Sequence, residues 1–140
     1  MDAADALYPT GPSATLGNDP VGEENLLAAD KAMKLSQQEK ALYKLHLTNL
    51  VGSGGVDNPN GSRSTLFQMS VGIGDKVYNI PTVWNGKILP TDAALSLAKQ
   101  EGIDKFPSYS SQEEAESRYK QMHSFMEKDT DKYLQYKKGR

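Results

Sequence analysis

The densest run of residues that could bind a phosphate or a cation is "VGSGGVDNPNGS", residues 51–62. A Walker-type phosphate loop needs a lysine followed by serine or threonine after its glycines, and this run contains no lysine. A calcium loop needs oxygen ligands at alternating positions, but Asp57, Asn58 and Asn60 lack that spacing and Pro59 occupies a ligand position. Glycine, proline and asparagine favour turns. We therefore predict an ordered structural loop without a metal.

The side chains that could act as nucleophile, base or acid show no catalytic spacing. His46 and His123 are the only histidines, and we expect both to be packing or rim residues on helices. Ser53 in "VGSGG" is the nearest approach to a G-x-S-x-G nucleophile turn, which the sequence lacks. The acidic residues of 113–131 lie on or beside the most charged predicted helix, where a solvated face is expected. We expect no catalytic residue, no metal and no cofactor, and hence no enzyme.

Composition restricts the partners that such a chain can have. The 140 residues include 16 basic and 18 acidic side chains, so no basic surface is expected to hold nucleic acid through its phosphates. There is no cysteine, which excludes disulfides and thiolate metal sites. No stretch approaches the roughly 18 apolar residues of a membrane span, so none is expected. With 37% hydrophobic residues the core must be small.

The N-terminal third divides into an arm and a helical start. Prolines and glycines in residues 1–22 disfavour regular structure, and we expect an extended arm whose sparse apolar side chains bind a partner: Leu7, Tyr8, Leu16 and Val21. Residues 23–35 predict a short amphipathic helix. Ser36 and Glu39 then have the spacing of a capping box, which predicts a helix to about residue 50. We assign residues 1–35 to the arm with its helix and residues 36–140 to a single module.

Three strands and two helices are predicted after the glycine-rich loop. "STLFQMSV", "KVYNIPTVW" and "KIL" predict a three-stranded antiparallel meander, with Asn85 and Gly86 forming a type I′ turn. Pro81 lacks a backbone donor, so we expect an edge or a bulge there. Helices are predicted at 92–101, capped by Thr91, and from a cap near Ser110 and Ser111, where Ser110 and Glu113 can form a capping box, to about residue 137. The fold class is α+β.

Trp84, the only tryptophan, stands just before the Asn-Gly turn. Beside Tyr78, three roles are open to it: a ligand-stacking platform, a core residue under the last helix, or an anchor for a protein partner. Core packing is favoured because the chain has few large apolar residues. In that role Trp84, Tyr78 and the turn would fix the small sheet against the helices.

Three stretches together resemble a module of tailed-bacteriophage virion proteins. They are the "IPTVWNGKIL" hairpin, the "FPSYSSQEEAESRY" entry to the last helix and the "MEKDT" segment, and the resemblance covers about residues 39 to 134. The module occurs within large internal or ejected proteins and near the ends of smaller structural proteins. No catalytic residue is carried over from it.

The resemblance implies a location in the virion, in contact with portal, neck, tail or ejection proteins. Since the module is nearly the whole chain, we expect a non-enzymatic structural or adaptor component, present in several copies in a symmetric assembly. The alternative is an internal virion protein that is ejected on infection and assists cell-wall penetration or DNA delivery.

Overall fold

A computed structural model describes residues 15–16, 19–20 and 22–138 of the chain. It has helices and antiparallel strands, so the α+β class is confirmed. The helices are α2 (Glu23–Met33), α3 (Gln37–Val51), α4 (Thr91–Glu101), the short 3-10 helix η1 (Ile103–Lys105) and α5 (Gln112–Lys138). The strands are β1 (Thr15–Leu16), β2 (Asp19–Pro20), β3 (Val56–Asp57), β4 (Arg63–Ser64), β5 (Met69–Ile73), β6 (Lys76–Ile80), β7 (Val83–Trp84), β8 (Lys87–Ile88) and β9 (Ser108–Tyr109).

The three-stranded sheet has the order β5-β6-β9 and is antiparallel throughout. The expected meander is therefore wrong in its third strand, because residues 87–88 pair only with β7 in a separate hairpin. The reason lies at Pro81, where β6 has ended. The next two amides, of Thr82 and Val83, both donate to the carbonyl of Leu66, so the chain turns away from the sheet. The vacant edge of β6 is taken by β9.

The Asn-Gly turn forms as predicted between β7 and β8. Asn85 and Gly86 have φ angles of 51° and 78°, the two positive values of a type I′ turn. The turn lies against the glycine-rich loop, since the Gly86 amide donates to the Gly54 carbonyl at 3.1 Å. Trp84 is half-buried against the core, and its indole donates to the Pro81 carbonyl. Trp84 and the turn thus hold the hairpin in place.

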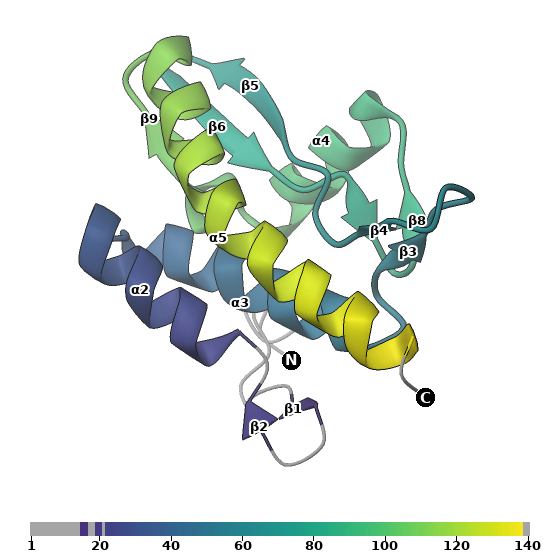
Figure 1. Ribbon diagram of the computed structural model, residues 1–140. Helices are drawn as coiled ribbons and strands as arrows, with labels where there is room; N and C mark the ends of the chain where they lie inside the picture. The colour runs from purple at the N-terminus through teal and green to yellow at the C-terminus, as the bar shows by residue number, and fades with distance from the viewer. Residues whose placement is uncertain (1–14, 17–18, 21, 139–140) are drawn as a thin grey trace.

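The helix α5 crosses the whole molecule (Figure 1), with α2 and α3 along one side and the sheet at its N-terminal half. Ser36 and Glu39 form the predicted capping box at the start of α3. The cap of α5 is Ser111, one of the two serines expected there, whose hydroxyl accepts from the Glu114 amide. The capping bond thus joins Ser111 and Glu114, not Ser110 and Glu113 as predicted. Thr91 is likewise wrong as a cap, because it is the first residue of α4 and no side chain caps that helix.

The hydrophobic core is continuous from α2 to α5. Ala29 and Met33 of α2 are buried in the same cluster as Leu42, Tyr78 and Met122. The core therefore includes part of the segment that the sequence analysis assigned to the arm.

The predicted arm is described only in part. Leu16 belongs to β1, which pairs with β2. Leu7, Tyr8 and Val21 lie outside the described residues.

Candidate functional site

A buried polar cluster surrounds Asp129 in the middle of α5. The Asp129 side chain is 1% exposed, although the sequence analysis expected a solvated carboxylate on a charged helix. Its oxygens accept hydrogen bonds from Asn25 of α2 at 2.6 Å and from the Tyr43 hydroxyl of α3 at 2.7 Å. One carboxylate of α5 is thus hydrogen-bonded to both α2 and α3. The sequence signal was its position, three residues after Met126 and four before Tyr133, within the apolar line of α5.

His46 of α3 completes this cluster. Its Nε2 lies 3.3 Å from Asp129 Oδ2, and its Nδ1 lies 2.6 Å from Thr65 Oγ1. Burial lowers the pKa of His46, and this effect outweighs the opposing contribution of Asp129. A neutral imidazole therefore bridges Asp129 and Thr65. This agrees with the expected packing role, with the addition that every polar atom of the ring has a partner.

A second buried acid, Glu39, joins the start of α3 to α5 and β9. Arg118 donates to both of its carboxylate oxygens, at 2.7 and 3.0 Å, and the Tyr109 hydroxyl donates to Oε2 at 2.9 Å. Burial alone would raise the pKa of Glu39, but the hydrogen bonds from Arg118, the Ser36 amide and Tyr109 together lower it. The ionised form is therefore the one that the fold favours.

The glycine-rich loop is an ordered structural element, as predicted. Arg63 donates to the carbonyls of Asn49, Leu50 and Gly52, so that it caps the C-terminal end of α3, and it also pairs with Asp57 at 2.8 Å. Asn58 and Asn60, considered above as calcium ligands, instead bond Ser62 of the same loop and Ser64 of β4. Within the described part of the chain, no three His, Cys, Asp or Glu side chains gather where they could hold a metal ion.

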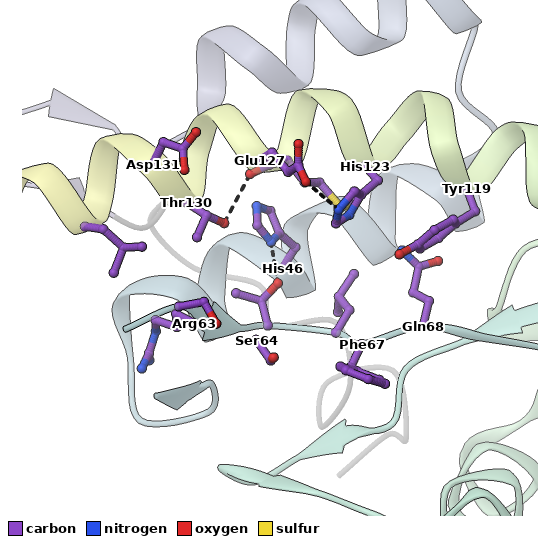
Figure 2. A pocket seen from close by; sticks show the side chains of 15 residues that line it. His46, Arg63, Ser64, Phe67, Gln68, Tyr119, His123, Glu127, Thr130 and Asp131 are labelled. Carbon is purple, nitrogen blue, oxygen red and sulfur yellow. Dashed lines mark hydrogen bonds and ion pairs between the residues drawn. The ribbon is translucent and has the colours of Figure 1, made fainter. Parts of the chain in front are cut away.

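A groove of about 570 Å³ opens between α5 and the segment 62–68. Figure 2 shows α5 as one wall, carrying Tyr119, His123 and Glu127, and the segment through Phe67 as the other, with His46 between them. His123 stacks on Tyr119, with ring centroids 5.3 Å apart, and its Nε2 lies 3.0 Å from Glu127 Oε1. The sequence analysis overlooked this carboxylate four residues after His123. His123 is nevertheless a rim residue, as expected.

Phe67 marks the rim of this groove. Its φ angle is 45°, a left-handed value that is rare for an aromatic residue and costs about 1–3 kcal/mol. Its side chain is 62% exposed, so no burial offsets that cost. Strain of this kind persists only where the surroundings hold the backbone. Here the carbonyls of Leu66 and Phe67 accept bonds from the backbone and side chain of Thr82.

The contacts Thr65–His46–Asp129 have the order hydroxyl, imidazole, carboxylate that activates a nucleophile in hydrolases. Two features distinguish this cluster from such a site. Asp129 Oδ2 is already occupied by the Tyr43 hydroxyl, which is closer to it than His46 is. Thr65 is buried, at 8% exposure. The arrangement therefore suits cross-linking of α3 and α5 better than transfer of a proton to a substrate.

The predicted structural residues lie away from this groove. Tyr78 is buried in the core, and Pro81, Trp84, Asn85 and Gly86 form the end of β6 and the β7-β8 hairpin. The sequence analysis missed Asp129, Arg118 and Phe67. Arg118 and Phe67 carry no local signal, because the bond of Arg118 to Glu39 spans 79 positions and the φ angle of Phe67 is set by tertiary contacts.

No family model, curated protein or solved structure matches the chain. Among the described residues, none of the helices has both the length and the apolar character of a bilayer span.

Proposed function

We propose that this chain is a non-enzymatic structural or adaptor component of a tailed-phage virion. In this proposal it contacts portal, neck, tail or ejection proteins and is present in several copies. Its compact module provides one contact surface. Its N-terminal arm provides another through Leu7, Tyr8, Leu16 and Val21.

The observation that carries the proposal is the hydrogen bonding of the two buried acids. Glu39 and Asp129 each accept several hydrogen bonds from different elements, and these bonds connect α2, α3, β9 and α5. Buried carboxylates that are fully occupied in this way favour a single rigid arrangement over chemistry on a ligand. Both lie within the span, residues 39 to 134, that resembles the virion module.

Mass spectrometry of purified particles tests the proposal. We expect the chain in a fixed ratio to the portal protein, and a map of the particle should place each copy against a neighbouring virion protein. Particles that lack the chain would overturn the proposal.

The same particles separate the proposal from its alternative, a protein ejected on infection. They are analysed before and after ejection is triggered in vitro. A structural or adaptor component remains with the emptied particle at unchanged ratio. Loss of the chain together with the DNA would instead establish the ejected role.

A further inference from the structure

The groove beside α5 continues past both of its ends. A hollow of about 290 Å³ shares Gln68 and Tyr119 with it, and a hollow of about 480 Å³ shares Asp131 and Leu134 with it. Together they follow α5, whose 27 residues correspond to about 40 Å at 1.5 Å per residue. An extended polypeptide of about 12 residues has that length.

The walls of this groove favour a basic occupant. Glu116, Glu127 and Asp131 project from α5 along it and are all exposed, and none has a lysine or arginine partner among the described residues. The one arginine of the groove, Arg63, is committed to Asp57 and to three carbonyls. Lys137 and Lys138 line only the hollow at the C-terminal end of α5, so the acidic part of the groove runs from Glu116 to Asp131. Phe67 and Tyr119 add aromatic faces, which attract guanidinium and ammonium groups.

The strand β5 provides backbone groups for an extended occupant. It is an edge strand, and its residues Met69 and Ser70 line the hollow at the N-terminal end of α5. Ile73 and Lys76 flank a two-residue turn and so form a hydrogen-bonded pair. Alternation then leaves the peptide groups of Ser70 and Gly72 directed away from β6, where an added strand finds donors and acceptors.

We propose that this groove binds an extended, basic segment of a neighbouring virion protein. The inference rests on the proposed function for the nature of the partner. The N-terminal arm of this chain, from the same or a second copy, is disfavoured as the occupant because its charge is negative. Residues 1–21 contain Asp2, Asp5 and Asp19 and no lysine or arginine.

Fluorescence anisotropy with a labelled 12-residue peptide of alternating arginine and valine tests the proposal on the full chain. We expect saturable binding that weakens as salt is raised, and none to the matching peptide of glutamate and valine. The double variant Glu127→Gln/Asp131→Asn should weaken binding about ten-fold, the effect of two exposed ion pairs. Phe67→Ala should weaken it too, whereas Phe67→Tyr keeps the aromatic face and should retain it.

The matched control is Glu24→Gln/Asp92→Asn, which removes two exposed charges outside the groove and should leave affinity within about two-fold. Hydrogen exchange should show slower exchange at Ser70 and Gly72 when the arginine peptide is bound. Equal loss of affinity in the two double variants would overturn the proposal, because the attraction would then be non-specific. So would binding of the glutamate peptide.

Light scattering tests whether a second copy of this chain occupies the groove instead. Dimers that form with rising concentration and are dissociated by the arginine peptide would replace the partner segment with a second copy and overturn the proposal. The presence of the chain in particles is measured separately. A groove that fails in these tests while the chain is found in virions would leave the proposed function intact.

Discussion

Arg118 donates to both carboxylate oxygens of Glu39, so that the N-terminal third of α5 is joined to the first turn of α3. The third guanidinium nitrogen donates to the carbonyl of Met33 at the end of α2. One side chain therefore connects three helices. Two parallel hydrogen bonds to a carboxylate are stronger and more directional than a single ion pair.

Replacing Arg118 with alanine should lower the free energy of unfolding by about 3–5 kcal/mol, since Glu39 remains buried without its cation. Arg118→Lys keeps the charge but loses the paired geometry, and should cost less. Urea unfolding followed by circular dichroism measures both. Lys120→Ala, at an exposed site two residues along the same helix, is the control. A loss no greater than that of the control would mean that the pair contributes nothing.

Stability should fall in acid through Glu39. Its native pKa is lower than the ordinary 4.5, so its contribution is complete above pH 4.5 and is lost as pH falls through the lower native value. Unfolding free energies measured from pH 7 to pH 3 should therefore decline more steeply for the wild type than for Glu39→Gln. Parallel profiles would contradict the role given to this carboxylate.

Gly86→Val should destabilise the hairpin more than Gly74→Val destabilises the β5-β6 turn. Both glycines have positive φ, 78° and 64°, so both variants bear the strain of about 1–3 kcal/mol. A Cβ at Gly86 would additionally lie 2.8 Å from the Ser53 carbonyl oxygen, whereas nothing lies within 4 Å at Gly74. Calorimetry should show the lower melting temperature for Gly86→Val. Equal melting temperatures would mean that the turn does not dock on the glycine-rich loop.

Thr65→Val should destabilise the protein by about 1–3 kcal/mol, because Nδ1 of the buried His46 loses its partner. Thr130→Val is the control, since that hydroxyl bonds only the Met126 carbonyl of its own helix.

The wild-type protein should hydrolyse neither peptidoglycan nor activated esters. Hydrolysis that disappears in folded Thr65→Val would contradict the cross-linking role and assign Thr65 as a nucleophile.

Local signals were sufficient for several parts of the fold. The Ser36–Glu39 capping box and the Asn85-Gly86 turn depend on residues within three positions of one another, and both form. The capping pair of α5 was predicted one residue too early, at Ser110 and Glu113, because Ser110 and Ser111 are adjacent and both reach Glu114. Spacing alone does not distinguish them.

The remaining features depend on distant residues. β9 takes the edge of β6 only because the chain turns away after Pro81, which no property of residues 108–109 indicates. Asp129 is buried because Asn25, Tyr43 and His46 come from two other helices to bond it. The groove beside α5 follows from the same packing and has no sequence pattern of its own.

The side-chain hydrogen bonds to α5 also determine when folding can finish during synthesis. Asn25 and Asp129 are 104 positions apart, and a ribosome takes about 5–20 seconds to add that many residues. Until then the apolar faces of α2 and α3 have no α5 to cover them. Contacts of such high sequence separation slow folding as well. The newly made chain thus exposes apolar surface to the chaperones and proteases of the cell that makes it, and rapid translation through residues 112–138 would favour its yield.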